Sequence, residues 1–394
     1  MYLVLLIIYY SNVISIKMTL LTKSHEVEIL SNKLQNEPFI CIDTEFIREK
    51  YYYPKLCLIQ IGDSKGNGWA IDPLINKINL NPIFKLLLDK KILKVLHSPR
   101  QDFEIIFNIL KKIPKPIFDT QSAAMSCGYG DSASYESLVD KIVNIKLDKS
   151  ARFTNWEIRP LNEKQINYAI SDVTHLSKIY LFLRDHMNKN KRTSWIKEEV
   201  EKFKDLSLYK TEPLNAWKRI KFYSPNIETM SIFRQIAKLR EDLAKKYNLP
   251  RNKIFRDDVI IRLAKNPPNN IKDFDNLRGI NLKKIDMPYR NLILKNIEIG
   301  KKNKNTEWLS IKNTKSPSKA TIDILKIILQ SCSEKHNISP ILIANKEDIK
   351  LIAQGEKDVK ALKGWRYEVF GFLALKLMKG QLSLKITNGA VIVE

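Results

Sequence analysis

Apolar and polar residues alternate along the first half of the chain in a pattern that predicts short strands and helices. Apolar runs bounded by turn residues predict strands at Pro38–Phe46, Lys55–Gly62, Gly68–Ile71, Ile92–His97 and Pro116–Phe118. Apolar residues at helical spacing predict helices at 81–88, 100–110, about 120–127, 134–144, 163–187 and 190–204. Short connections between the first three strands favour antiparallel pairing. We therefore expect an α/β domain with a mixed sheet and flanking helices over residues 19–204.

The second half of the chain shows helical periodicity only. Residues 205–225 carry Pro213 and Pro225 with little periodicity, which indicates a linker. Helices are expected at 227–247, 256–264, 271–277 and 289–299, and then at 319–336, 346–353 and 368–378. Each group begins with a long helix that ends shortly before a proline, which suggests a weak internal duplication. We expect a first all-helical module over 226–302, a Lys-rich connector over 303–315 and a second, divergent module over 316–385.

Residues 1–18 are expected to lie outside the fold. The apolar run Tyr2–Ile16 is shorter than the roughly 20 residues that a membrane span needs. It has no basic residue before it and no clear small-residue cleavage site, so it makes a poor signal peptide. We expect Met18 to be the real start and the preceding residues to be an upstream artefact, with a membrane anchor as the alternative.

The charge of the chain favours a polyanion as partner. Sixty-seven Lys and Arg residues outnumber 43 Asp and Glu residues, which leaves a formal net charge of +24. An AT-biased genome, which enriches Lys, Ile and Asn, is the alternative explanation. Residues 205–394 hold 37 basic and 20 acidic residues against 30 and 23 in residues 1–204, so the excess lies in the C-terminal half. The four scattered cysteines form no C-x-x-C pair, which argues against zinc and fits a reducing cytoplasm.

Acidic residues at three places in the first domain suggest a metal site. Asp43 and Glu45 are two apart at the end of the first strand, so both project from the same face. Taken alone, they could equally be two solvated acids. Asp102 lies in the first turn of the helix after the fourth strand, and Tyr168 and Asp172 share one helical face at i,i+4 spacing.

Four converging carboxylates would repel one another strongly without a cation. Oxygen-rich sites suit Mg²⁺ or Mn²⁺, and two such ions about 3.5–4 Å apart form a phosphoryl-transfer site. Asp43 is the expected ligand shared by both ions, and Glu45 is expected to hold the ion that carries the attacking water. Tyr168 would orient that water or help to remove its proton.

These residues carry a resemblance to a known family. The chain resembles bacterial ribonuclease D, of the DEDD 3′-to-5′ exonucleases with a tyrosine in the third motif. Asp43 and Glu45 match the first motif, Asp102 the second, and Tyr168 with Asp172 the third. The resemblance extends over about residues 19–385 and includes these further segments: 52–61, 97–102, 118–121, 147–150 and 156–161. The two helical modules resemble the HRDC modules of that family, the first more closely than the second.

The resemblance implies a ribonuclease H-like fold, two Mg²⁺ or Mn²⁺ ions and trimming of tRNA precursors and other RNAs at free 3′ ends. It also implies release of nucleoside 5′-monophosphates. We further expect a monomeric, cytoplasmic protein without a membrane partner. The same chemistry on DNA is one rival, because the catalytic residues do not read the 2′-hydroxyl. A catalytically silent RNA-binding scaffold is another, although the intact acids argue against it.

Several other residues are candidates for weaker roles. Phosphate could be bound near the acids by Arg100, Lys149 and Arg152, or these could be solvated surface residues. In the first module a group of basic residues could form a helix face that tracks phosphates, or it could be a solvated helix side. The group consists of Arg234, Lys238, Arg240, Lys245, Lys246, Arg251 and Arg256. His97 is expected to be packed and hydrogen-bonded and Asp119 to orient backbone. His175 is expected near the helical face of Asp172, with contact to the site as the minority alternative. The sequence contains no P-loop and no G-x-G-x-x-G, which argues against an NTPase or a dinucleotide enzyme.

Overall fold

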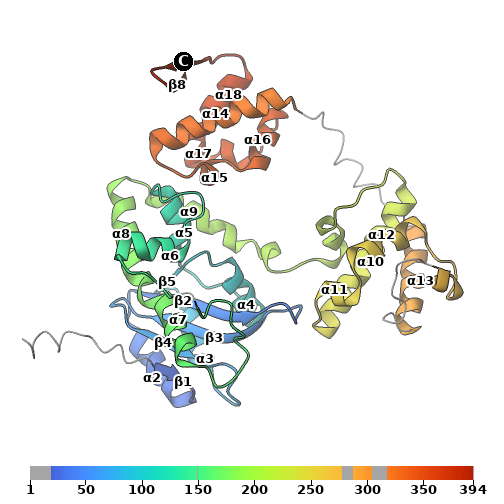
Figure 1. Cartoon of the computed structure of the whole chain (residues 1–394), viewed down its shortest axis with the longest axis horizontal. Coiled ribbons are helices and arrows are strands. Elements are labelled where there is room, and N and C mark those ends of the chain that lie inside the picture. The colour runs from blue at the N-terminus through green and yellow to red at the C-terminus, as the bar shows by residue number, and fades with distance from the viewer. Residues whose placement is uncertain (1–18, 149, 277–286, 304–316, 394) are drawn as a thin grey trace, which may run out of the picture. The chain divides into compact units, whose positions relative to one another are not determined.

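The computed structural model describes residues 19–148, 150–276, 287–303 and 317–393 (Figure 1). They form two compact units: one from the chain up to Phe46 with Leu56–Lys204 and Ser318–Glu394, the other from Ile47–Lys55 and Asp205–Pro317. Our predictions for residues 1–18, for Lys149 and for almost all of the 303–315 connector lie outside the described residues. Within the described ranges, no helix combines the length and the apolar character that crossing a membrane requires.

A six-stranded mixed sheet forms the centre of the first unit (Figure 1). Its order is β1-β4-β3-β2-β5-β6, with β3 and β4 antiparallel and the pairs β1–β4, β2–β5 and β5–β6 parallel. The strands are β1 Thr19–Leu21, β2 Phe39–Ile47, β3 Lys55–Gly62, β4 Gly68–Ile71, β5 Leu93–Leu96 and β6 Ile117–Asp119. The predicted mixed sheet is confirmed. Strand β1 was not predicted, because three residues are too few to show an alternating pattern.

The register of β2 and β5 decides where the acidic residues lie. Cys41 pairs with Val95, and β5 ends one residue later at Leu96, whereas β2 continues to Ile47. Asp43 and Glu45 therefore stand beyond the end of β5, where the chain turns toward the helix α4, Arg100–Leu110. The preceding part of β2 is fully buried, which fixes the strand in the core.

Helices flank the sheet, and most agree with the predictions. The observed helices of this part are α2 Ser24–Leu34, which was not predicted, α3 Asn81–Leu88, α4, α5 Thr120–Ser126, α6 Tyr135–Leu138 with a π turn at Val139–Val143, α7 Glu163–Thr174, α8 Leu176–Lys189 and α9 Thr193–Glu201 with a 3₁₀ turn at Lys202–Lys204.

The single helix predicted over 163–187 is wrong, because α7 and α8 are separate helices that meet at His175. The Thr174 and Ser177 hydroxyls donate hydrogen bonds to the carbonyl groups of Ser171 and Thr174. Such back-bonding within a helix competes with the regular pattern and bends it.

Two glycines allow α7 to approach the sheet closely. A Cβ atom at Gly62 would lie 2.9 Å from the Val173 carbonyl oxygen, and one at Gly68 would lie 2.7 Å from the Thr174 methyl group. Both distances are shorter than side chains tolerate, so glycine is required at these positions of β3 and β4. The close approach brings Asp172, at the end of α7, to the sheet.

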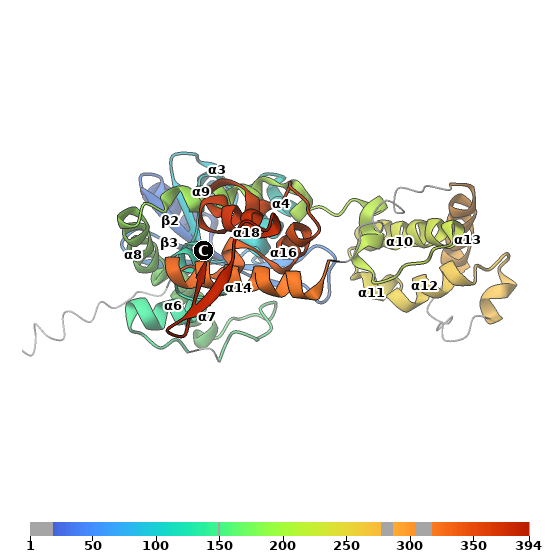
Figure 2. The ribbon, with the colours of Figure 1, turned by 90° about the horizontal axis from the view of Figure 1, so that it is seen from above.

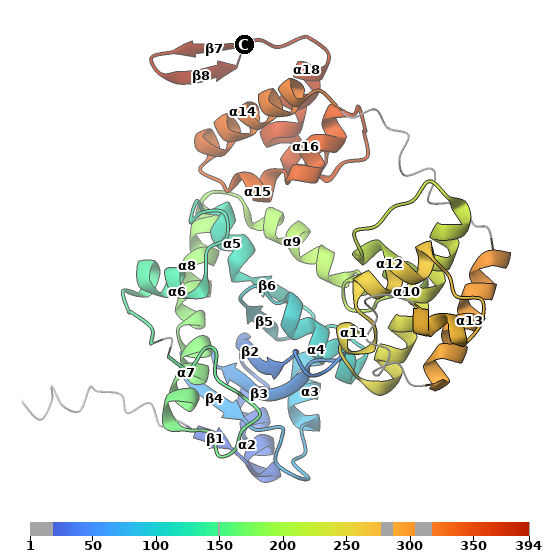
Figure 3. The same cartoon turned by 45° about the vertical axis from the view of Figure 1, so that its right-hand side comes forward.

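The C-terminal residues complete the first unit. They form α14 Lys319–His336, α15 Pro340–Ile343, α16 Lys346–Ala353, a 3₁₀ turn at Lys360–Leu362, α17 Gly364–Arg366, a π turn at Tyr367–Gly371, α18 Phe372–Met378 and a hairpin of β7 Leu384–Thr387 and β8 Ala390–Val393 (Figure 3). Their apolar core also contains Met125 of α5, and Trp195 of α9 packs against it. The region predicted as a second module therefore shares its core with the nuclease part of the chain.

The second unit is helical, and α10, α12 and α13 pack beside one another (Figure 2). Its helices are α10 Ile227–Tyr247, α11 Arg251–Ile254, α12 Asp257–Lys265 and α13 Met287–Lys302, with 3₁₀ turns at Leu206–Leu208, Pro213–Arg219 and Lys272–Asn276. Ala216 and Ile220, from the region predicted as a linker, are buried in this unit, and Ile220 belongs to its core. The hydroxyl group of Tyr52, in the segment 47–55, donates a hydrogen bond to the buried Glu241 carboxylate.

Candidate active site

Strand β2 and helix α7 bring three carboxylates together. Oxygen atoms of Asp43, Glu45 and Asp172 all lie within 4.8 Å of one another. Asp43 and Glu45 share a face of β2 as the alternation of side chains requires, and the intervening Thr44 points the other way. The predicted convergence of the first and third motifs is therefore seen in the geometry.

Asp102 is held next to this group by a hydroxyl. It is 7 % exposed and lies in the first turn of α4, where the Thr44 hydroxyl donates a hydrogen bond of 2.5 Å to its Oδ1 atom. Its charge raises the pKa of both Asp43 and Glu45, although Asp102 is not one of the three acids whose oxygen atoms lie within 4.8 Å of one another. Sequence reasoning missed Thr44. Its position between two acids was the available signal.

The four carboxylates are electrostatically unfavourable without a cation. Burial and then the charges of the neighbouring acids raise the pKa of Asp43 and of Glu45 well above their usual range. Burial also raises the pKa of Asp102 to about 6 and that of Asp172 to about 7. Arg152 opposes this effect by lowering the pKa of Glu45 and Asp172. A cluster of hard oxygen donors with excess negative charge fits a divalent cation such as Mg²⁺ or Mn²⁺.

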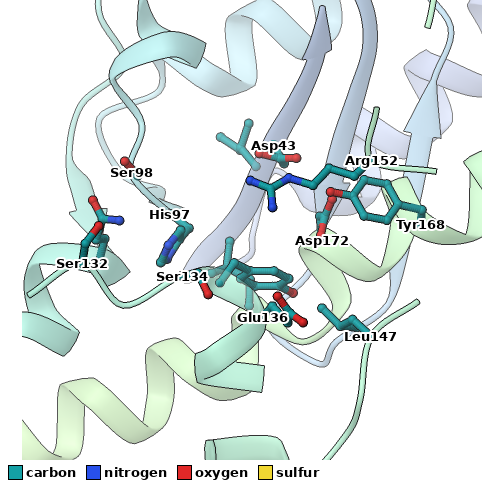
Figure 4. A pocket seen from close by; sticks show the side chains of 14 residues that line it. Asp43, His97, Ser98, Ser132, Ser134, Glu136, Leu147, Arg152, Tyr168 and Asp172 are labelled. Carbon is teal, nitrogen blue, oxygen red and sulfur yellow. The ribbon is translucent and has the colours of Figure 1, made fainter. Parts of the chain in front are cut away.

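A pocket of about 400 Å³ opens beside these acids (Figure 4). Asp43, Arg152, Tyr168 and Asp172 line one part of it, and the Tyr168 side chain lies beside the Asp172 carboxylate. The remaining wall is largely polar and consists of His97, Ser98, Gln121, Ser132, Ser134, Tyr135, Glu136, Leu147, Ile42 and Leu176. The volume lies in the range of small-ligand sites.

The weaker candidates near the site have defined positions. His97 lines the pocket, its Nδ1 atom lies 3.0 Å from the Thr120 hydroxyl, and burial lowers its pKa. Asp119 is buried and accepts hydrogen bonds from the backbone N–H groups of Ser98 and Gln121, which confirms its structural role. His175 lies between α7 and α8 and is not among the residues that line the described pocket.

The basic candidates fall into two groups. Arg152 lines the pocket, and Arg100 is exposed at the start of α4. In the second unit several of these side chains bind within the protein: Lys238 to Asp242, Lys245 to the Thr211 carbonyl, Arg251 to Glu241, and Arg234 against the Trp217 ring. Arg240 is buried and bonded to Asp257 and the Phe255 carbonyl, so its predicted place on an exposed phosphate-tracking face is wrong.

Comparisons with known protein families divide the chain into two recognisable parts. A family model described as 3′-5′ exonuclease matches residues 18–188, which include all five candidate catalytic positions. The HRDC domain model matches residues 230–297. One HRDC match was found where two modules were expected, so the fold that the comparisons support is an exonuclease domain with one HRDC domain.

Curated relatives match nearly the whole chain. Ribonuclease D of Bartonella henselae is 38% identical over 380 residues, covering 95% of this chain and 93% of the relative. Ribonuclease D of Granulibacter bethesdensis is 36% identical over 373 residues, covering 93% and 94%.

A solved structure supports the same fold. The crystal structure of Escherichia coli RNase D matches with a TM-score of 0.77 at 24% identity, covering 92% of this chain and 98% of that one. The exonuclease domain and these relatives make the chain a hydrolytic 3′-5′ exoribonuclease. The chain thus belongs to the ribonuclease D family.

Proposed function

We propose that Asp43, Glu45, Asp102 and Asp172 hold two Mg²⁺ or Mn²⁺ ions, and that these acids with Tyr168 perform the hydrolysis. The observation that carries this proposal is the approach of three carboxylates within 4.8 Å, with the pKa of each raised. When bound, such ions polarise the scissile phosphate and lower the pKa of water. The protein supplies the donor oxygen atoms and holds them on the rigid elements β2, α4 and α7.

Tyr168 serves to orient the attacking water. Burial and the charges of Asp172, Glu45 and Asp43 raise its pKa above the usual range, so the phenol stays protonated at neutral pH. A protonated phenol can donate one hydrogen bond and accept others, which suits the orientation of water better than removal of its proton. Its side chain lies beside the Asp172 carboxylate, at the edge of the acidic group.

The substrate of this proposal is RNA with a free 3′ end, tRNA precursors among them. One terminal nucleotide enters the pocket, where Arg152 meets the phosphate, and each cycle releases a nucleoside 5′-monophosphate. The HRDC domain and the excess of positive charge in residues 205–394 support binding of the remaining RNA. Affinity is therefore expected to fall steeply as the salt concentration rises.

The domain limits and the setting of the protein are part of the same proposal. The nuclease domain extends over 19–204, the HRDC module over 226–302 and a second, divergent HRDC-like module over 316–385. The two groups of helices share a long first helix, α10 or α14, that ends at an Asn in the left-handed conformation, which supports a common ancestry. We propose a monomeric, cytoplasmic protein, and sedimentation of the purified chain would test the monomer.

The test is digestion of a 3′-extended tRNA in the presence of Mg²⁺. Wild-type protein is expected to shorten the RNA from its 3′ end, and Asp43→Ala is expected to leave it intact. Asp185→Ala, which removes a carboxylate that is 66 % exposed in α8 of the same domain, serves as the matched control and should stay active. Equal digestion by wild type and Asp43→Ala would refute the site, and faster digestion of a matched DNA would refute RNA as the substrate.

A further inference from the structure

Residues 151–161, which we call the bracket loop, contain a segment that resembles the ribonuclease D family, although none of the four metal-binding candidates lies in the loop. The family-like segment is Trp156-Glu157-Ile158-Arg159-Pro160-Leu161. The loop begins beside Arg152 in the pocket and ends before Asn162, which caps helix α7. It therefore connects the wall of the pocket to the helix that carries Tyr168 and Asp172.

Arg159 fastens the bracket loop to the sheet. Its Nε and Nη2 atoms donate to the two carboxylate oxygens of Asp72 at 2.5 and 2.7 Å, and Nη2 also donates to the Cys57 carbonyl at 2.7 Å. Asp72 is buried directly after β4, and Cys57 belongs to β3. The paired bonds need the planar fork of a guanidinium group, which lysine cannot reproduce.

The same guanidinium group fixes the backbone of the loop. Its Nη1 atom donates to the carbonyl groups of Trp156 at 2.7 Å and Ile158 at 2.9 Å. At the other side of the loop, the Thr154 hydroxyl accepts a hydrogen bond of 3.1 Å from Gln165 in the first turn of α7. The loop is thus tied both to the sheet and to α7.

Trp156 presents its ring to Tyr168. The indole is 3 % exposed, and the two ring centroids lie 6.2 Å apart with an angle of 35° between the planes. No hydrogen-bond partner within the described residues accepts from its buried Nε1 atom, so contact with rings and apolar groups explains the placement of Trp156. An aromatic neighbour restricts the two side-chain torsions of Tyr168, whose hydroxyl must meet Asp172.

We propose that Trp156 is a positioning residue, which holds the Tyr168 ring so that its hydroxyl stays at Asp172. Arg159 and Asp72 serve the reaction through Trp156 by fixing the backbone that carries it. This inference rests on the role proposed above for Tyr168. Ordinary packing of a buried tryptophan would affect stability alone, whereas positioning predicts energetic coupling between Trp156 and the Tyr168 hydroxyl.

A double-mutant cycle tests the coupling. We would measure kcat and KM on a 3′-extended RNA with wild type, Trp156→Leu, Tyr168→Phe and the double variant. Trp156→Leu is expected to lower kcat between about 10-fold and about 100-fold at nearly unchanged KM, as for groups that orient a reacting side chain. In the Tyr168→Phe background the same change should lower kcat by less than about threefold, because the hydroxyl to be positioned is already missing.

If the kcat losses of the two single variants multiply in the double variant, the proposal for Trp156 is wrong. The assignment of the metal-binding acids is not affected by that outcome. Full activity of Tyr168→Phe would instead refute the role proposed for Tyr168, and with it the inference. Trp156→Phe, which keeps an aromatic ring, should restore most of kcat, and failure of that rescue would count against positioning.

Folding and metal binding are measured alongside activity. Mg²⁺ titration by calorimetry should give the same affinity for Trp156→Leu as for wild type, and a loss of that affinity would contradict the inference. Trp365→Leu is the matched control, since that indole is also buried and stacks on Trp195. It should lower the melting temperature without coupling to Tyr168. If Trp156→Leu does not fold, Arg159→Lys keeps the indole, breaks the paired bonds and is expected to show the same cycle.

Discussion

Two groups of buried carboxylates in the first unit differ in how their charge is compensated. In the candidate active site, burial and mutual repulsion raise the pKa of the acids. In α9, the carboxylate of Glu199 is 3 % exposed and pairs with Arg366, which is 1 % exposed, while Lys360 contributes a contact of 3.2 Å. Arg366 also binds Glu198 at 2.8 Å and the Leu342 carbonyl at 3.0 Å.

The difference separates a functional site from a structural one. The pairs at α9 are complete within the protein, so they fasten α17 to α9 and leave little unpaired charge. The acids of β2, α4 and α7 lack such compensation, which destabilises the metal-free protein and creates affinity for a divalent cation. A substitution that neutralises one charge should therefore lower the stability of the protein at the α9 pairs and raise the stability of the metal-free protein at the acids of β2, α4 and α7.

The largest expected effect is the loss of stability from Arg366→Met. The change leaves Glu199 buried with weaker partners, and breaking a buried pair costs about 3–5 kcal/mol. Because Lys360 still contacts Glu199 in this variant, the expected loss of stability lies near the lower end of that range, at about 3 kcal/mol. Urea unfolding monitored by circular dichroism would measure it.

The control for this prediction is Arg366→Met combined with Glu199→Met. Removing both charges should restore part of the lost stability, because no buried charge then lacks its partner. A double variant less stable than Arg366→Met would show that the region depends on packing of the side chains rather than on charge compensation.

Asp43→Asn is expected to have the next largest effect, on activity, with the opposite sign for stability. Loss of a donor carboxylate should reduce kcat/KM at least about 100-fold, which corresponds to about 2.7 kcal/mol in the barrier. The metal-free variant should unfold at a higher urea concentration than wild type, since one repelling charge is gone. If Asp43→Asn is less stable than wild type in EDTA, the charges of this cluster are not uncompensated in the metal-free protein.

The pH dependence of the metal-free protein follows from the same charges. The folded-state pKa values of Asp172, about 7, and Asp102, about 6, lie above the unfolded value near 4. The folded protein therefore binds more protons than the unfolded chain between these values, and stability falls as the pH rises from about 4 to about 7. Asp172→Asn should reduce this fall by at least about 1 kcal/mol.

Unfolding in EDTA at several pH values, compared with unfolding in Mg²⁺, would measure the effect. Bound metal favours the ionised acids and should flatten the profile. Identical profiles of wild type and Asp172→Asn in EDTA would indicate that Asp172 is not the group that titrates.

The smallest effect is expected at the aromatic stack beside the α9 pairs. Trp195 and Trp365 lie 4.4 Å apart at an angle of 10°, and such pairs contribute about 0.5–1.5 kcal/mol beyond the area that they bury. A double-mutant cycle of Trp195→Leu and Trp365→Leu in urea unfolding should recover a coupling in that range. No coupling would assign the docking of α17 and α9 to the charge pairs alone.

Much of the active site could be predicted from local patterns. Alternation in a strand placed Asp43 and Glu45 on one face, and helical spacing placed Tyr168 with Asp172. The predicted helix over 100–110 is observed as α4, which carries Asp102 in its first turn. Local periodicity did not reveal the break at His175 between α7 and α8, where the Thr174 and Ser177 hydroxyls bond to backbone carbonyl groups.

Contacts between distant parts of the chain could not be predicted in this way. The hydroxyl of Thr44 meets Asp102 across 58 positions, and Arg366 meets Glu199 across 167. No periodicity links residues at such separations. Nor does sequence alone indicate that Arg251 and Arg240 are engaged by buried or neighbouring acids.

The sequence by itself determined five of the six strands of the sheet, most helices, the identity of the candidate ligands and the resemblance to one nuclease family, because these depend on local spacing and residue type. Tertiary structure decided which charges are compensated. The register of β2 on β5, the close approach of α7 over Gly62 and Gly68, and the packing of α17 on α9 set the distances between charges. Those distances and the accompanying desolvation decide whether a buried carboxylate is paired within the protein or needs a metal ion to compensate its charge.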